Sequence, residues 1–172
     1  MSKNEHMEIS VQSFLTNTQV EAICRLWNDE YPRKLQYDSI NNFNDYLDNL
    51  GNKMYFLLTN EDGILLGWAA TFLRDNEKWL AIILSSNVQG KKYGTKVLDE
   101  IKQYESYLVG WVIDKEGELK SNGNEYKSPL PFYIKNGFKV LEGHRIESDK
   151  ISAVKIKWQS EDRFDELPNS YS

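Results

Sequence analysis

Cysteine and histidine are scarce in this chain. Cys24 is the single cysteine among 172 residues, and His6 and His144 are the two histidines. One cysteine excludes an intrachain disulfide and is typical of a reducing compartment. Cys24 falls on the inner side of a predicted helix, so we expect a buried structural residue rather than a catalytic thiol. We predict no metal site.

Long hydrophobic runs are absent as well. The N-terminal segment MSKNEHMEIS lacks the apolar stretch of a signal peptide. No apolar run reaches the roughly 20 residues that cross a bilayer. We therefore expect a soluble cytoplasmic protein without a membrane partner.

An excess of positive charge is also lacking, since the formal net charge is -5. General nucleic-acid binders need a basic face, so we predict no nucleic-acid partner. The acidic balance agrees with a cationic partner, although solubility alone is the commoner reason for such a charge.

The chain does have ample material for a hydrophobic core. Hydrophobic residues make up 40% of it and aromatic residues 13%. A chain of this length fits one domain that buries roughly 70% of its unfolded surface. Neither a repeat nor a linker divides it. We predict one domain over residues 1–158, followed by an acidic polar tail over 159–172.

Apolar periodicity predicts a mixed α/β domain with the element order β-α-α-β-β-β-α-β-α-β-β. Strands are expected at 7–14, 54–58, 64–73, 79–84, 107–113, 138–146 and 151–158, and helices at 18–31, 40–50, 94–104 and from either 129 or 131 to 136. A capping box at Thr18 begins the first helix, and Gly51 ends the second. The third helix is expected to bury Tyr104, and Gly137 is expected to end the fourth in a left-handed conformation.

The most informative segment is WLAIILSSNVQGKKYGTKVLDEI, residues 79–101. An apolar strand, a polar turn with glycines and an amphipathic helix follow one another here. This order directs several backbone N–H groups and a helix N-terminus toward one point. Such a point binds phosphate or pyrophosphate without a charged side chain.

Two motifs lie in order around this segment. The turn reads Gln89-Gly90-Lys91-Lys92-Tyr93-Gly94-Thr95, and a later segment reads Pro131-Phe132-Tyr133-Ile134-Lys135-Asn136-Gly137-Phe138. Together they resemble the GNAT superfamily of acyl-CoA-dependent N-acyltransferases, whose pyrophosphate loop is Gln/Arg-x-x-Gly-x-Gly/Ala and whose later helix ends in Tyr-x-x-x-Gly-Phe. The element order is similar to that fold over residues 7–158. The glycine motifs of dinucleotide and nucleoside-triphosphate folds are absent.

The resemblance implies transfer of an acetyl group from acetyl-CoA, the cosubstrate, to a primary amine. It implies cofactor contacts from the main chain of the strand and the turn, at Ile82, Ile83, Leu84, Gln89, Gly90, Lys91, Lys92, Tyr93, Gly94 and Thr95. An N–H group near Leu84 would polarise the thioester carbonyl. Tyr133 matches the family's general acid, which protonates the departing thiolate.

Lys92 departs from the family pattern, because it stands where the motif has its first glycine. We expect a negative φ at Lys92, already within the first helical turn, since positive φ carries a steric cost for lysine. Its ammonium either adds charge beside a phosphate of CoA or is simply solvated.

The rest of the site stays open. Candidate bases are Glu30, Asp75, Glu77 and Asp114. The acceptor region is expected around the first two helices, which carry the aromatic residues Trp27, Tyr31, Tyr37, Phe43 and Tyr46 beside the acidic residues Asp29, Glu30 and Asp38. Residues 115–127 form either a lid or an ordinary mobile loop. The acceptor is a small-molecule or peptide amine. A non-catalytic acyl-CoA sensor of the same fold is the alternative, and a homodimer is left open.

Overall fold

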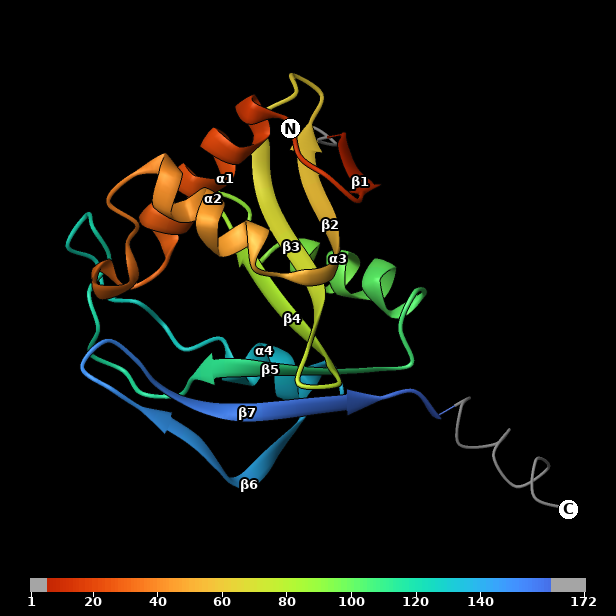
Figure 1. Ribbon diagram of the computed structural model, residues 1–172, viewed down its shortest axis with the longest axis vertical. Coiled ribbons are helices and arrows are strands. Elements are labelled where there is room, and N and C mark those ends of the chain that lie inside the picture. The colour runs from red at the N-terminus through yellow and green to blue at the C-terminus, as the bar shows by residue number, and fades with distance from the viewer. Residues whose placement is uncertain (1–5, 162–172) are drawn as a thin grey trace, which may run out of the picture.

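The computed structural model describes residues 6–161, which form one mixed sheet with helices on both faces (Figure 1). The strand order is β1-β2-β3-β4-β5-β7-β6. The strands are β1 (Met7–Gln12), β2 (Gly51–Asn60), β3 (Leu65–Arg74), β4 (Glu77–Leu84), β5 (Tyr107–Ile113), β6 (Lys139–Glu147) and β7 (Ser152–Gln159). The helices are α1 (Asn17–Glu30), the short 3-10 helix η1 (Arg33–Leu35), α2 (Ile40–Asp48), α3 (Tyr93–Lys102) and α4 (Leu130–Lys135). The predicted fold class and element order are confirmed, and η1 is an addition to them.

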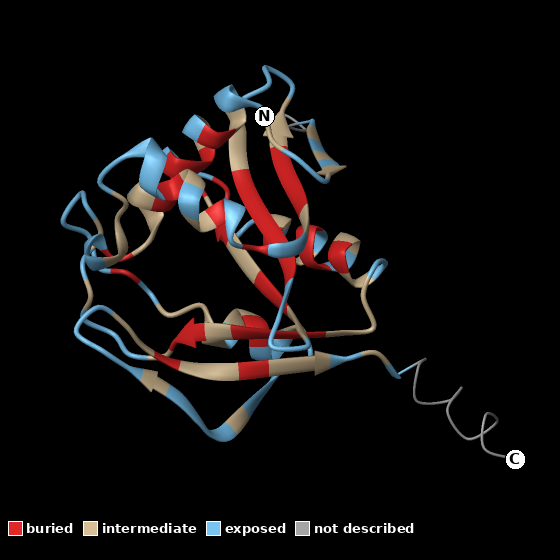
Figure 2. Ribbon diagram, viewed as in Figure 1, coloured by how far each residue is buried: buried red, intermediate tan, exposed pale blue. Residues whose placement is uncertain are grey.

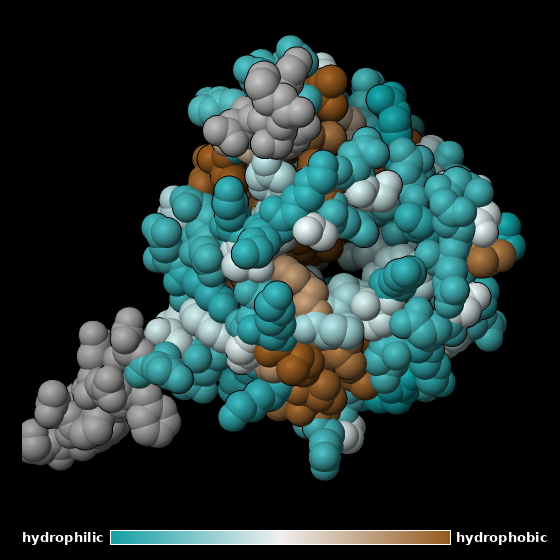
Figure 3. Space-filling model, turned by 180° about the vertical axis from the view of Figure 1, so that it is seen from behind, coloured by the Kyte–Doolittle hydropathy of each residue, from teal (hydrophilic) through white to brown (hydrophobic). Residues whose placement is uncertain are grey.

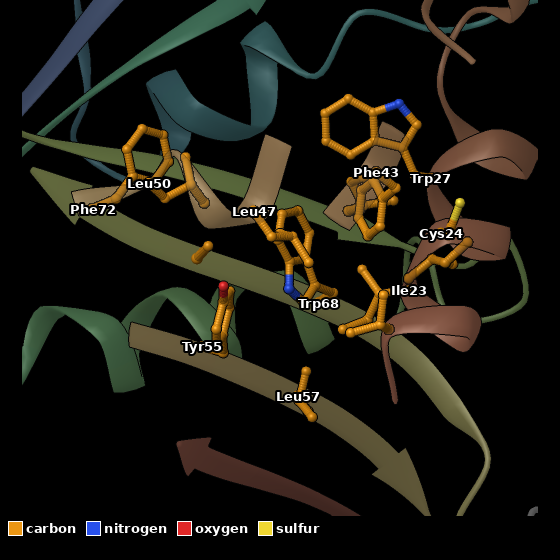
Figure 4. Close-up of a cluster of buried hydrophobic side chains, with 14 of the residues drawn as sticks. Ile23, Cys24, Trp27, Phe43, Leu47, Leu50, Tyr55, Leu57, Trp68 and Phe72 are labelled. Carbon is orange, nitrogen blue, oxygen red and sulfur yellow. The ribbon is translucent and has the colours of Figure 1, made fainter. Parts of the chain in front are cut away.

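Two hydrophobic clusters hold the helices against the sheet. One joins α1 and α2 to β2 and β3, and Figure 4 shows Trp27, Phe43 and Leu47 of the helices meeting Tyr55 and Trp68 of the strands. The other joins α3 and α4 to the opposite face. Figure 2 shows that burial is concentrated along β2, β3 and the inner sides of the helices. The sheet is therefore covered on both faces in its central part.

Three local predictions about the helices are wrong. The capping box of α1 is built on Thr16, whose side chain accepts from the Gln19 N–H at 3.1 Å, rather than on Thr18. Gly51 opens β2, because α2 already ends at Asp48. Tyr104 is half exposed, since α3 ends at Lys102, before the turn that would have buried it.

The end of α4 agrees with its prediction. Gly137 has a φ of 93°, in the left-handed region that favours glycine. The N–H of Phe138 then donates to the carbonyl oxygen of Tyr133 at 3.0 Å and closes the helix. Of the predicted tail, Gln159 belongs to β7, and residues 162–172 lie outside the described part of the chain.

The sheet divides between its two parallel central strands. β4 and β5 share a single register pair, Trp79 with Val109, and their parallel hydrogen-bonded ladder continues no further. At that point the strands approach closely, because a Cβ atom on Gly110 would lie 3.2 Å from the carbonyl oxygen of Leu80. Beyond it the carboxyl ends of the strands, Leu84 and Ile113, separate. This split in the sheet places the candidate site.

Candidate active site

At the split, alternate backbone N–H and C=O groups of β4 point away from β3 and have no partner strand. The N–H of Ser85 donates to the carbonyl oxygen of Leu66 on β3 at 2.8 Å. Because backbone groups alternate in direction along a strand, the N–H and C=O of Leu84 and Ile82 point the other way, into the split. Those of Ile83 face β3, where Ile83 is opposite Trp68. The sequence-predicted segment 82–84 therefore presents alternate residues to the split.

The carbonyl oxygen of Leu84 is already occupied. The side-chain amide Nε2 of Gln89 donates to it at 2.9 Å, which folds the turn back onto the end of β4. The N–H of Leu84 is left as the donor at the end of the strand, where β5 has separated from β4.

The turn after β4 offers a set of backbone donors. Among residues 6–161, none accepts a hydrogen bond from the backbone N–H groups of residues 89–95. The first N–H group of this region with a partner is that of Lys96, which donates to the carbonyl oxygen of Lys92 at 3.2 Å. Positive φ at Gly90 (77°) and Lys92 (69°) turns the chain tightly on both sides of Lys91. Consecutive free N–H groups in such a turn, at a helix N-terminus, form an anion-binding concavity.

The expected conformation of Lys92 is wrong. Lys92 has a φ of 69° and a ψ of 7°, and it is the N-terminal cap of α3 rather than a residue of its first turn. The turn needs a left-handed residue where the family motif has glycine, and Lys92 adopts that conformation at a cost of about 1 kcal/mol. The side chains of Lys91 and Lys92 are both exposed at the mouth of the turn.

Gly94 joins the turn to the helix on the other side of the split. A Cβ atom at this position would lie 3.0 Å from Cε1 of Phe132 and 3.2 Å from Cδ1 of Leu84. Such contacts are too close for an unchanged packing. The buried Gly94 therefore allows α3, α4 and the end of β4 to meet at one place.

Tyr133 lies in α4 with only 7% of its surface exposed. Phe132 and Phe138 pack edge-on against its ring, with centroids at 5.1 Å and 5.3 Å. No described residue forms a hydrogen bond with its hydroxyl group, whose oxygen is not among the fully buried atoms without a partner and is therefore accessible. Burial, followed by the nearby Tyr126, raises the pKa of Tyr133 well above 10, so the phenol keeps its proton at neutral pH.

A family model now decides which fold family these features represent. The model of the acetyltransferase (GNAT) family matches residues 20–106, which is half of the chain. The chain belongs to the GNAT family of acetyltransferases. It is thus an acyl-CoA-dependent N-acyltransferase by family. No curated protein matches the sequence significantly.

Solved structures share the GNAT fold with this chain at low sequence identity. An aminoglycoside 6'-N-acetyltransferase complexed with coenzyme A has a TM-score of 0.65 at 11% identity, over 88% of this chain and 96% of that one. A phosphinothricin acetyltransferase from Sinorhizobium meliloti in complex with AcCoA has a TM-score of 0.62 at 11% identity, over 92% and 89%. A spermidine N-acetyltransferase chimera from Vibrio cholerae and hSSAT has a TM-score of 0.61 at 15% identity, over 88% and 95%.

The described part of this GNAT domain lacks two features. No helix among residues 6–161 is long and apolar enough to cross a membrane. The same residues contain no group of three or more His, Cys, Asp or Glu side chains placed to hold a metal ion.

The candidate bases differ in their distance from the carboxyl end of β4 and in their bonding partners. Asp75 lies in the turn before β4 and Glu77 is the first residue of β4, and at about 3.3 Å per residue Glu77 is roughly 23 Å from Leu84. Asp114, after β5, forms two hydrogen bonds of 2.9 Å with the guanidinium of Arg145. That hydrogen-bonded partner lowers the pKa of Asp114, which makes it a weaker base.

Glu30 is the candidate that reaches the carboxyl end of β4. Its Oε2 accepts a hydrogen bond from the N–H of Ser86 at 2.9 Å, and its Oε1 lies 3.3 Å from Nζ of Lys120. The two charged side chains are mostly buried, with 10% of Glu30 and 14% of Lys120 exposed. Both carboxylate oxygens are thus engaged, so Glu30 fastens α1 and residue 120 to the β4 turn.

Most of the aromatic residues near the split serve the core. The indole N–H of Trp27 donates to the carbonyl oxygen of Leu35 at 2.9 Å, and Phe43 is fully buried. Tyr37 and Tyr46 stack around the same indole, with centroids at 5.3 Å from it. Tyr31 is at the edge of this cluster and contacts Tyr126 across the split, at 6.2 Å. Asp29 and Asp38 are exposed.

Residues 115–127, expected to form either a lid or an ordinary mobile loop, contain a hairpin that was not predicted from the sequence. Leu119 and Glu125 form an isolated antiparallel bridge, so part of the predicted loop 115–127 is a small hairpin. The Asn-Gly pair at 122–123 between them was the signal that could have revealed it.

A hollow opens on the molecular surface in the region of the split. Figure 3 shows it near the centre of the face seen from behind, with hydrophobic atoms at its bottom. In Figure 1 the corresponding region lies between the end of β4, the end of β5 and the segment that follows β5.

Proposed function

We propose that the protein transfers an acetyl group from acetyl-CoA to a primary amine by direct attack, with Tyr133 as the general acid. The observation that carries the proposal is the convergence of unpaired donors on the split between β4 and β5. The N–H of Leu84 has no strand partner in β5, and the N–H groups of residues 89–95 and the hydroxyl of Tyr133 form no hydrogen bond with a residue among 6–161.

The residues present fit acetyl-CoA. Its pantetheine arm is an amide chain that pairs with the backbone groups of Ile82, in the manner of a strand. Its pyrophosphate takes the free N–H groups of residues 89–95. The exposed ammonium groups of Lys91 and Lys92 add positive charge at the mouth of the turn. Ile83 supports this arm from the core side of β4.

The reaction needs one polarised carbonyl and one proton for the leaving group. The N–H of Leu84 donates to the thioester oxygen, and a preorganised donor of this kind is worth roughly 3 kcal/mol. The deprotonated amine forms the new C–N bond while the C–S bond breaks. Tyr133 gives its proton to the departing sulfur and regains one from the attacking nitrogen.

We assign the deprotonation of the amine to water rather than to one of the candidate carboxylates. An alkyl ammonium has a pKa near 10.4, so only a small fraction is deprotonated at neutral pH. Glu30 and Asp114 are held by other groups, which favours water as the carrier of that proton. A single cysteine supports a reducing compartment such as the cytoplasm as the place of the reaction.

Thiol release tests the proposal directly. The protein is incubated with acetyl-CoA and a panel of amines that includes spermidine, an aminoglycoside, phosphinothricin and a peptide with a free N-terminus. We expect amine-dependent release of the CoA thiol. Binding of CoA by calorimetry, without thiol release for any amine, would instead identify an acyl-CoA sensor.

A further inference from the structure

We propose that the hairpin of residues 118–126 forms the outer wall of the acceptor site, and that Tyr126, together with Tyr31, restricts the acceptor to small free amines. The inference rests on the proposed acetyl transfer and names its substrate class.

The hairpin is a defined structure. The N–H of Lys120 donates to the carbonyl oxygen of Asn124 at 2.8 Å, and the N–H of Tyr126 donates to that of Glu118 at 2.7 Å. A tight turn closes its tip, where the N–H of Gly123 donates to the carbonyl oxygen of Lys120 at 3.0 Å. These internal hydrogen bonds hold the hairpin together as one unit.

One side of the hairpin is attached to the end of α1 and to η1. The carbonyl oxygen of Leu119 accepts from the N–H of Arg33 at 2.9 Å. The hydroxyl of Ser121 donates to the carbonyl oxygen of Asn28 at 3.2 Å. The ion pair of Lys120 with Glu30 adds a mostly buried attachment, which also reaches the turn after β4.

The other side belongs to the second half of the sheet. Tyr126 is 9% exposed and packs with Ile113, the last residue of β5, and with Ala153 of β7. The hairpin thus connects the two halves of the sheet at the open end of the split. Figure 1 shows this segment reaching from the end of β5 to α1 and η1 before it returns to α4.

Three phenols gather behind this wall, one from each neighbouring element. Tyr31 follows α1, Tyr126 ends the hairpin and Tyr133 lies in α4. The rings of Tyr31 and Tyr126 meet edge-on at 6.2 Å. The pKa of Tyr31 is raised by burial and then by Tyr126 and Tyr133.

None of the three hydroxyl groups forms a hydrogen bond with a described residue. Among the described residues, Nε1 of Trp68 is the one fully buried side-chain polar atom without a partner, so these three hydroxyl oxygens are accessible to solvent or to a ligand. Phenolic oxygens accept hydrogen bonds from an amine, and the ring faces attract an ammonium ion. The cluster is suited to hold an amine next to the acid Tyr133.

The hairpin wall limits the size of the group that is attached to the amine. An acceptor whose chain extends from the amine past the hairpin has to cross the hairpin or displace it. Displacement breaks the attachments of Leu119, Lys120 and Ser121. An acceptor that ends before the hairpin needs no such opening, and this favours small amines over a peptide chain. The same attachments make Lys120 and Glu30 positioning residues for the wall.

The test compares small amines with a peptide in three forms of the protein. The forms are the wild type, a shortened hairpin with residues 119–125 replaced by Gly-Gly, and Lys127→Ala as a control. Lys127 is exposed next to the hairpin and has no contact in the site. The values of kcat/KM are measured with spermidine, an aminoglycoside, phosphinothricin and a hexapeptide with a free N-terminus.

We expect the wild type and the control to prefer one of the small amines over the hexapeptide by at least roughly 100-fold, and the shortened hairpin to reduce that ratio by roughly tenfold or more. Equal efficiency of the wild type with peptide and small amines, or an unchanged ratio in the shortened form, overturns the inference alone. Absence of thiol release with every amine overturns the proposed function as well.

Tyr126→Phe supplies a second variant that keeps the packing of the ring. We expect its KM for the preferred small amine to rise roughly tenfold, because one hydrogen bond to the amine is lost, with kcat little changed. Tyr133→Phe lowers kcat instead. A Tyr126→Phe variant with unchanged KM overturns the role of Tyr126 in the acceptor site.

Discussion

The side-chain amide of Gln89 donates to the carbonyl oxygen of Leu84 at 2.9 Å and thereby fixes the turn that precedes α3 to the end of β4. One hydrogen bond couples the two parts of the proposed acetyl-CoA site, the N–H of Leu84 for the thioester and the amides of residues 89–95 for the pyrophosphate. The family motif has Gln or Arg at this position, and both side chains carry N–H donors.

Replacement of Gln89 by alanine should loosen this coupling. The turn loses its attachment, so its amides are no longer preorganised for the pyrophosphate, and we expect the Kd for CoA to rise roughly tenfold. Calorimetric titration with CoA measures the change. Gln103→Ala, at the exposed far end of α3, is the matched control and should bind CoA normally. Equal affinity of both variants would contradict the coupling.

Two substitutions of Lys92 separate backbone strain from charge. Lys92→Gly removes the ammonium and relieves the left-handed strain, whereas Lys92→Ala removes the ammonium and keeps the strain. We expect the glycine variant to be more stable than the alanine variant by about 1 kcal/mol in urea unfolding. Both should lose CoA affinity equally if the ammonium contacts a phosphate. Wild-type affinity in both variants would leave Lys92 a solvated residue.

Gly94→Ala tests the close packing at the end of β4. The new methyl group would meet Phe132 at about the limit of contact, so we expect destabilisation by about 1–2 kcal/mol and weaker CoA binding. Thermal unfolding and calorimetry measure the two effects. The double variant Gly94→Ala with Phe132→Leu should recover part of the stability. If Gly94→Ala alone is as stable as the wild type, the contact carries no constraint.

We expect the protein to lose stability in alkaline solution because burial raises the pKa of several tyrosines. Burial is the largest cause that raises the pKa of each of Tyr31, Tyr37, Tyr46, Tyr55, Tyr126 and Tyr133, to about 12 for Tyr55. Unfolded tyrosines ionise near pH 10 and the folded ones only above it, so the unfolded state binds fewer protons there. The stabilising contribution is complete below pH 10 and decreases as the pH rises through the folded pKa values.

Thermal unfolding between about pH 8 and pH 11.5 measures this effect, and phenolate absorbance reports the ionisation itself. We expect the Tm to fall above about pH 10, and a Tyr55→Phe variant to fall less steeply. A Tm that is constant over this range, or six tyrosines that ionise near pH 10 in the folded protein, would contradict the raised pKa values of these tyrosines.

The strand, turn and helix of residues 79–101, which form the proposed acetyl-CoA site, could be predicted from the sequence because their signals are local. The apolar run before Leu84, the glycines of the turn and the helical spacing after Gly94 each depend on nearby residues. The positive φ of Lys92 could not, since the usual signal for a left-handed residue is glycine. The helix start at Thr16 was misassigned because both Thr16 and Thr18 are followed three residues later by Gln or Glu.

The proposed acceptor site could not be predicted from the sequence, because its contacts join distant parts of the chain. Glu30 meets Lys120 and Ser86 only after the sheet divides and α1 packs across it. The hairpin of residues 118–126 has neither apolar alternation nor a helical period, so it resembled an ordinary loop. Its attachments to Arg33 and Asn28 are long-range contacts that no local pattern encodes.

The turnover rate of Tyr133→Phe tests the central claim most directly. The substitution keeps the ring packed between Phe132 and Phe138 and removes only the proton donor. We predict that kcat for thiol release falls by roughly 100-fold or more, while the Kd for CoA stays within about twofold of the wild type. A variant that binds CoA normally and turns over at the wild-type rate would contradict Tyr133 as the general acid.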